Sequence, residues 1–514
     1  MTRTEGAFYE DAEWRRTRWD KKLQVTVPSI DWSVVLPSLP PFEKNFYHPH
    51  PDVEARSSEE SEKILSDNKI QIIRPNQCCT VPKPVTNMIE ASFPEYITAR
   101  LCDFLGGPFV QPTPVQKLMW PAALAGRDVL AIAPTGTGKT LGYLLPAIVH
   151  ISAQEPVKLG DNSPIVLVVA PTRELVIQIM EQAVIYGSAI TELGAQALSP
   201  VGVFGGVKKF DQKWEIQEKR PDFIVATLGR LTDFLNDGTL SLHRVTYFVV
   251  DEVDRLITMD GNIRINNEDF VLTMKSVSKL IRPDRQCVMV SATCTKDILE
   301  LGKEFCGNGP LYFQVAEIDQ TEKLIVSSNV AQSFVAGYDS FSQRLAFLTE
   351  SILPETFTES LSRTEQKMII FLNTRKRVDD LTEHLREAGW PAIGIHSDKV
   401  QEEREWIFKN FKDGTNNILV ATDVMGRGMD FEDVRCVVNF DLPASIETYI
   451  HRVGRTGRIG KRIKKGYALS FVSISDWDII PRLEKLLSDC GLEGSPVLCE
   501  KIRQQQNYKQ HRYY

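Results

Sequence analysis

The sequence has 514 residues, enough for two large domains or about three average ones, and its formal net charge is -7. Hydrophobic residues make up 42% and charged residues 25%, which excludes wholesale disorder and a uniformly basic surface. The sequence offers no membrane helix, signal peptide, disulfide framework or zinc motif, so we expect an intracellular protein, nuclear or cytoplasmic, without membrane contact.

Residues 1–84 differ from the rest of the chain. They combine mixed charge, a proline-rich piece at Leu36–Pro41 and an acidic, helix-like run at Asp52–Asp67. This composition predicts an N-terminal extension that is partly disordered.

Short apolar runs separated by amphipathic segments follow, first over residues 85–306 and again over 331–490. Runs of this length, bounded by Pro, Gly or Asp, are typical of strands buried on both faces of a parallel sheet. The pattern predicts an α/β fold with two tandem domains, joined by a short linker at 307–330. The runs are Val129–Ala133, Ile165–Ala170, Phe223–Thr227, Tyr247–Val250 and Cys287–Val290, then Met368–Leu372, Ala392–His396, Ile418–Thr422, Cys436–Phe440 and Tyr467–Val472.

Residues 491–514 form a basic tail. Its last fourteen residues, from Lys501 to Tyr514, hold four Lys or Arg, three Tyr and no acid. A frayed, solvated terminus explains this composition, and so does contact with nucleic acid through charge and stacking.

A glycine-rich turn joins the first predicted strand to a helical stretch at Leu141–His150. In this position backbone N–H groups and the helix N-terminus favour a bound phosphate chain. Lys139 is placed for the β- and γ-phosphates, and the Thr140 hydroxyl for Mg²⁺. The turn reads Ala133, Pro134, Thr135, Gly136, Thr137, Gly138, Lys139, Thr140, with Ala133 where glycine is usual.

Two carboxylates follow the strand at Tyr247–Val250. Asp251 is suited to hold Mg²⁺, and Glu252 to orient and deprotonate an attacking water. Acidic residues at the end of a strand commonly belong to a solvated turn. Because these two follow a phosphate loop in the same predicted sheet, a catalytic role is the favoured interpretation. We therefore predict ATP and Mg²⁺ as cofactors, with Lys139, Asp251 and Glu252 in the catalytic group.

From Phe93 to Val472 the chain resembles the DEAD-box ATP-dependent RNA helicases. The segment Pro112–Gln116 is similar to the motif that reads adenine, so the resemblance implies adenine contacts for Gln116 and stacking for Phe93. It implies RNA contacts for Pro171, Thr172, Arg173, Gly205, Gly206, Thr227 and Arg230 in the first domain, and for Thr374, Arg404 and Thr422 in the second.

The remaining motifs link the two domains in this family. The resemblance implies that Asp430 binds nucleotide, that Arg455 and Arg458 act as arginine fingers, and that Ser291, Thr293 and His451 couple the domains. It also implies RecA-like folds, a monomer, RNA bound largely through its backbone, and protein cofactors from an RNA-processing complex. Unwinding of short duplexes or remodelling of RNA–protein complexes is the expected activity; an RNA clamp with little unwinding is the alternative.

Three departures from the family pattern stand out. Val253 replaces the alanine of Asp-Glu-Ala-Asp, Leu228 replaces a proline, and the polar stretch 259–269 resembles an inserted loop. None of them removes a catalytic group.

Overall fold

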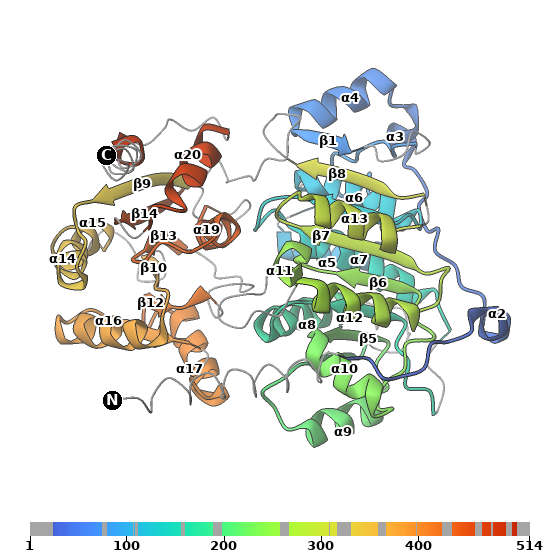
Figure 1. Ribbon diagram of the computed structural model, residues 1–514. Coiled ribbons are helices and arrows are strands. Elements are labelled where there is room, and N and C mark those ends of the chain that lie inside the picture. The colour runs from blue at the N-terminus through green and yellow to red at the C-terminus, as the bar shows by residue number, and fades with distance from the viewer. Residues whose placement is uncertain are drawn as a thin grey trace, which may run out of the picture. The chain divides into compact units, whose positions relative to one another are not determined.

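The computed structural model describes the chain in fifteen stretches that form two compact units. The first unit lies within residues 1–133 and 138–316, and the second within 317–514 together with 134–137 (Figure 1). The described residues are 24–73, 80–105, 107, 111–155, 160–188, 198–257, 267–307, 309–315, 330–357, 366–396, 398–423, 434–457, 465–473, 476–489 and 496–500.

The first unit contains an eight-stranded sheet in the order β1-β8-β2-β7-β6-β3-β5-β4. Every pairing is parallel except that of β1 with β8. The strands are β1 Ile70–Ile73, β2 Val129–Ile132, β3 Val166–Val169, β4 Pro200–Val203, β5 Phe223–Ala226, β6 Tyr247–Val250, β7 Gln286–Ser291 and β8 Leu311–Val315.

Helices cover both faces of this sheet (Figure 1). They are α5 Glu95–Leu105, α6 Pro114–Leu124, α7 Lys139–Ser152, α8 Arg173–Gly187, α9 Lys209–Lys219, α10 Leu228–Asn236, α11 Val253–Ile257, α12 Asn267–Lys279 and α13 Lys296–Phe305. Because alternate strand residues point to opposite faces, Val129 and Ala131 join one core while Leu130 and Ile132 join another. The sheet is therefore buried on both sides, as its apolar strands predict.

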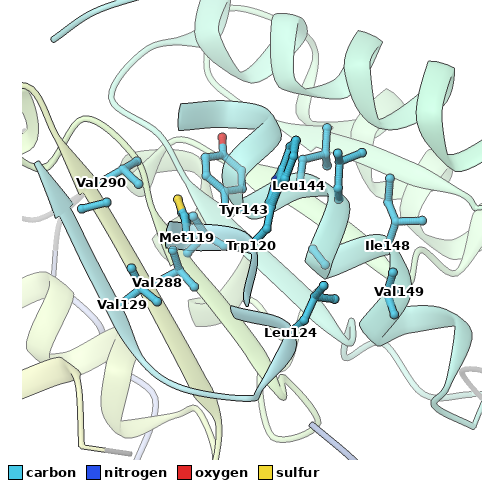
Figure 2. Close-up of a cluster of buried hydrophobic side chains, with 14 of the residues drawn as sticks. Met119, Trp120, Leu124, Val129, Tyr143, Leu144, Ile148, Val149, Val288 and Val290 are labelled. Atoms are coloured by element: carbon cyan, nitrogen blue, oxygen red, sulfur yellow. The ribbon is translucent and has the colours of Figure 1, made fainter. Parts of the chain in front are cut away.

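Close packing of α6 against α7 sets the position of the phosphate loop. Figure 2 shows Met119 and Trp120 of α6 beside Tyr143 and Leu144 of α7. A Cβ added at Gly142 would lie 2.6 Å from the Met119 sulfur, so glycine leaves room for this side chain without a shift. The Trp120 indole donates to the Leu141 carbonyl at 3.1 Å, which satisfies its N–H inside the core.

The N-terminal extension packs onto the first unit. It contains the short helices α2 Trp32–Val35 and α3 Pro51–Ala55, the helix α4 Ser58–Asp67 and strand β1, which belongs to the sheet of the first unit. Phe42 and Phe46 each meet the buried His150 ring edge-on at 5.9 Å. The Phe46 N–H donates to the Leu124 carbonyl at 2.6 Å, and the Arg282 guanidinium lies over the Phe42 ring.

The second unit contains a six-stranded, fully parallel sheet in the order β11-β12-β10-β13-β14-β9. Its strands are β9 Val330–Ala336, β10 Lys367–Phe371, β11 Ala392–Ile395, β12 Ile418–Ala421, β13 Val434–Asn439 and β14 Gly466–Val472. Its helices are α14 Phe341–Phe347, α15 Leu353–Thr356, α16 Arg375–Glu387, α17 Gln401–Lys412, α19 Ile446–Val453 and α20 Ile480–Asp489. Both domains are thus α/β with parallel sheets, as predicted.

Four strands differ from the sequence-based expectation. β1, β4 and β9 were not predicted, and β8 lies inside the segment assigned to the linker at 307–330. β8 pairs with β2 in parallel, so the first unit continues past residue 306. The predicted insertion at 259–269 and the tail from Lys501 fall largely or wholly outside the described residues.

Gly126 offers a test of how tightly the extension is held. Its φ is +72°, and an added Cβ would lie 2.5 Å from the Lys44 carbonyl oxygen; Gly238 has the same φ but open space around it. Gly238→Ala should lower the free energy of unfolding by about 1–2 kcal/mol through backbone strain alone. Gly126→Ala should cost more and speed proteolysis of the extension. Equal unfolding midpoints in urea for the two variants would contradict close packing of Lys44.

Candidate functional site

The predicted site residues of the first unit lie at the carboxyl ends of neighbouring strands. The phosphate loop and Asp251 directly follow β2 and β6, and Ser291 is the last residue of β7; these three strands are adjacent in the sheet. The predicted RNA contacts at Pro171–Arg173, Thr227–Arg230 and Gly205–Gly206 follow β3, β5 and β4, which continue the same sheet. Ligand sites in parallel α/β sheets lie at this edge, and the strand order separates the predicted nucleotide contacts from the predicted RNA contacts.

The phosphate loop is held by both of its flanks. The Ala133 N–H donates to the Ser291 carbonyl at 3.0 Å, and the Lys139 ammonium donates to the Ala133 carbonyl. Gly136 and Gly138 have φ values of +77° and +82°, which other residues adopt only with strain. Lys139 and Thr140 begin α7, so its unpaired N–H groups face the loop.

Gln116 lies against the end of this loop. Its Oε1 accepts from the Thr113 N–H at 3.0 Å, and its Nε2 donates to the Gly138 carbonyl at 3.0 Å. The side chain therefore connects the predicted adenine-reading motif to the loop. Phe93 is buried and packs edge-on against Trp120 at a centroid distance of 5.1 Å, so in this structure it contributes to the core.

Asp251 is buried at the end of β6. Its Oδ2 accepts from the Tyr143 hydroxyl at 2.7 Å, and its Oδ1 accepts from the Glu252 N–H at 2.8 Å. Burial, together with the neighbouring Glu252 charge, raises the pKa of Asp251 to about 6. A cation at this carboxylate would relieve both effects.

Glu252 occupies a strained backbone conformation, with φ at +48°. A left-handed conformation is uncommon for residues other than glycine and clusters at functional sites. The Glu252 carboxylate pairs with the buried Arg255 guanidinium at 2.9 Å. This pair holds the side chain at the carboxyl edge of the sheet.

Asp254 connects the acidic motif to the segment Ser291–Thr293. Its carboxylate accepts from the Ala292 N–H and the Thr293 hydroxyl, each at 3.4 Å, while the Ser291 hydroxyl donates to the Thr293 carbonyl at 2.8 Å. Ser291 and Thr293, predicted to couple the domains, are thus bound to the catalytic motif within the first unit.

The predicted RNA contacts Thr172 and Arg173 lie at the start of α8. Thr172 caps α8, and the neighbouring Arg173 guanidinium lies over the Phe204 ring. A Cβ added at Gly206 would lie 3.1 Å from Arg173, so this glycine leaves room for the arginine.

Thr227 and Arg230 belong to the start of α10, after β5. The Thr227 N–H donates to the Val203 carbonyl at 2.8 Å, and the Arg230 guanidinium donates to Gln212 Oε1 at 2.6 Å. Leu228, which replaces the usual proline, is buried in the core below. The turn is therefore supported by packing and by the Arg230–Gln212 bond.

In the second unit, Thr374, Arg404 and Thr422 also lie near carboxyl ends of strands. Thr374 caps α16 after β10, Arg404 lies in the first turn of α17, and Thr422 follows β12. His451 and Arg455 are buried at the end of α19, where the Arg455 Nε donates to the His451 carbonyl at 3.0 Å. Arg458 and Asp430 lie outside the described residues.

Arg452 was not predicted as a site residue, yet it connects three segments of the second unit that carry the predicted site residues Thr374, Thr422 and His451. Its side chain is fully buried and forms a bidentate pair with the Asp423 carboxylate. It also donates to the Asn373 side chain at 2.9 Å and to the Asp441 carbonyl at 2.6 Å. The sequence places Arg452 beside the predicted arginine finger, but nothing in its spacing identifies a buried guanidinium.

Comparison with known proteins identifies two family models in this chain. A DEAD/DEAH box helicase model matches residues 113–301, and a helicase conserved C-terminal domain model matches residues 348–460.

The described residues include no helix with the length and apolar character of a membrane span.

Curated relatives cover most of the chain. It is 38% identical to the ATP-dependent RNA helicase DBP2 of Eremothecium gossypii over 93% of its length and 78% of the relative, and 40% identical to that of Candida glabrata over 86% and 74%. Among solved structures, S. cerevisiae Dbp5 bound to RNA and ADP BeF3 is 25% identical with a TM-score of 0.62, covering 79% of this chain and 94% of that one. These likenesses confirm the tandem RecA-like fold.

Arg452→Met tests the buried guanidinium. Loss of the buried cation leaves the Asp423 and Asn373 oxygens without their donor, so the free energy of unfolding should fall by about 3–5 kcal/mol. Arg375→Met is the control, because Arg375 pairs with Asp398 at an exposed site and should cost under about 1 kcal/mol. Chemical denaturation of both variants measures the difference, and similar losses would refute the role of Arg452.

Proposed function

Because the chain belongs to the DEAD-box family of ATP-dependent RNA helicases, we propose that its predicted site residues perform the nucleotide and RNA chemistry of that family. The observation that carries this proposal is the order of the sheet edge. Adjacent strands β2, β7 and β6 bring the phosphate loop, Ser291 and Asp251 together, and β3, β5 and β4 continue with the predicted RNA contacts.

The phosphate loop fits a nucleoside triphosphate bound together with Mg²⁺. Positive φ values at Gly136 and Gly138 leave backbone N–H groups to face phosphates, and an added Cβ at Gly138 would meet Gln116 at 2.5 Å. Asp251 is buried with a pKa raised to about 6, so the carboxylate is suited to a cation. Thr140 and Asp251 would hold Mg²⁺, which supplies charge neutralisation to the phosphates when bound. Lys139 would hold the β- and γ-phosphates.

Within the Asp-Glu-Val-Asp motif, Glu252 is assigned the role of orienting and deprotonating the attacking water. Its carboxylate is fixed by Arg255 at 2.9 Å, so it can orient a water and accept its proton while remaining in place. Val253 is the first residue of α11, and its side chain is buried in the core. Burial of Val253 is compatible with hydrolysis in spite of the replaced alanine.

The RNA contacts are assigned to hydroxyls, backbone groups and guanidinium groups at strand ends. Groups such as Thr172, Thr227 and Thr374 suit phosphates and sugars, which position RNA without reading its sequence. A largely sequence-independent RNA site is therefore the proposal. Arg455 and Arg458 keep their assignment as arginine fingers, and Asp430 as a nucleotide contact, from the family resemblance alone.

The oligomeric state, the partners, the location and the domain limits of this protein are also proposed. The chain is expected to act as a monomer with protein cofactors of an RNA-processing complex, in the nucleus or cytoplasm. The domain limits at 85–306 and 331–490 apply to the catalytic units, with the first extended by β1 and β8 and the second beginning with β9 at Val330.

Glu252→Gln should retain ATP binding but lower turnover by about 10²-fold or more, because an amide can orient water but cannot accept its proton. RNA-stimulated phosphate release and strand separation of a short duplex should fall together. Glu300→Gln, on an exposed position of α13, is the control. Normal turnover by the Glu252 variant would rule out its role as base, and ATP turnover without strand separation in the unaltered protein would favour a clamp.

Gln116→Ala should reduce the preference for ATP over GTP, because the amide suits the adenine edge. Gln116→Glu separates this role from helix capping, since its carboxylate still accepts from the Thr113 N–H but loses the amide donor. Competition binding should show lost discrimination in both variants, with the thermal midpoint better preserved in the glutamate variant. Retained preference for ATP would limit Gln116 to a structural role.

A further inference from the structure

Helix α9 carries two large aromatic side chains on its exposed face. Phe210 is 77% exposed and Trp214 is 58% exposed, and both are large aromatic side chains. They are four residues apart, so their side chains are neighbours on the helix surface. Adjacent exposed aromatics form a patch that burial in the first unit does not explain.

The opposite face of α9 explains why the aromatics point outward. Gln212 and Ile216 are the buried residues of this helix, and each lies two positions from an exposed aromatic. At 100° per residue, two positions correspond to about 200°, which is nearly the opposite side of the helix. The docking of α9 on the sheet thus fixes the orientation of Phe210 and Trp214.

The same docking ties α9 to the predicted RNA contacts. Gln212 Nε2 donates to the Gly202 carbonyl of β4 at 3.0 Å, while its Oε1 accepts from Arg230 at 2.6 Å. Gly205 and Gly206 lie between β4 and α9 in the chain. The aromatic face is therefore held rigidly on the element that follows one RNA motif and bonds to another.

The charges around the patch are mixed, with a small cationic excess. Residues 208–220 hold the cations Lys208, Lys209, Lys213, Lys219 and Arg220 and the acids Asp211, Glu215 and Glu218. Lys209 and Lys213 both pair with the Asp237 carboxylate, at 2.8 and 2.9 Å. Within the described chain, Lys208 and Arg220 have no ion-pair partner, so they are available to phosphates at either end of the helix.

Resting on the RNA-helicase function above, we propose that the exposed face of α9 is an auxiliary site for single-stranded RNA. Phe210 and Trp214 stack on unpaired bases that extend beyond the motif contacts, and Lys208 neutralises a phosphate. Stacking tolerates any base, which suits a protein whose other contacts are to the backbone. Because the cationic excess is small, stacking contributes more affinity than charge.

Trp406 provides a contrast in the second unit. It is 55% exposed on α17, but its sequence neighbours include Glu402, Glu403 and Glu405. Residues 401–412 hold three acids and three bases, so α17 lacks the cationic excess of α9. Trp406→Ala is therefore a matched control for removal of an exposed tryptophan.

The test compares two RNAs in the full-length protein with a non-hydrolysable ATP analogue. One is a short single strand that fills the motif contacts, and the other is extended by about ten unpaired nucleotides at each end. The Phe210→Ala/Trp214→Ala variant should lose about 5- to 30-fold in affinity for the long RNA, as expected for one or two stacked bases, and little for the short one. Its salt dependence should be unchanged, whereas Lys208→Ala should reduce the salt slope by about 0.7.

The controls separate this site from the proposed function. Trp406→Ala should leave the ratio of affinities for the long and short RNAs unchanged, and the variants at Phe210, Trp214 and Lys208 should keep their thermal midpoint and their ATPase rate at saturating short RNA. Equal loss on both RNAs, no loss on the long RNA, or a thermal midpoint lowered by several degrees would each overturn the auxiliary site. If the unaltered protein shows no RNA-stimulated ATPase activity, the proposed function itself fails.

Discussion

The parallel register of β2, β7 and β6 is the constraint on which the catalytic edge depends. Ile132 lies opposite Ser291, and Met289 lies opposite Val250, so these three strands end within a residue or two of one another. Each strand is buried on both faces, and a slip of one residue would exchange its two sets of side chains between the cores. Hydrophobic burial thereby fixes the register of the strands, and with it the positions of Ala133, Asp251 and Thr293 at the carboxyl edge of the sheet.

The groups at this edge reduce the stability of the unliganded unit. Asp251 has a pKa raised to about 6, so the stabilisation from its protonated form is present at low pH and is lost as the pH rises through 6. Glu252 adds backbone strain at a positive φ. Two extensive apolar cores offset these costs, and bound Mg²⁺ and nucleotide would favour the ionised, strained arrangement.

Central strands and contiguous motifs were predictable, because continuous apolar runs and glycine turns are local signals. The strand at β4 was missed because its sequence Pro-Val-Gly-Val contains two residues that are unfavourable in strands, and β9 because Gln332 and Ser333 interrupt its apolar run. β8 lies among irregular sequence and was assigned to a linker. Arg452, Gln212 and Asp254 act through partners distant in sequence, and no local pattern identifies such contacts.

The packing of the extension against α7 bears on which segments of this protein must be kept together in evolution. His150 lies in the last turn of α7, and burial lowers its pKa to about 3, so it stays neutral under Phe42 and Phe46. The helix that begins at the phosphate loop thus ends beneath residues that precede the catalytic domain by about forty positions. Recombination or truncation at the motif boundary would separate parts that fold as one, so the extension and the first unit are expected to evolve together.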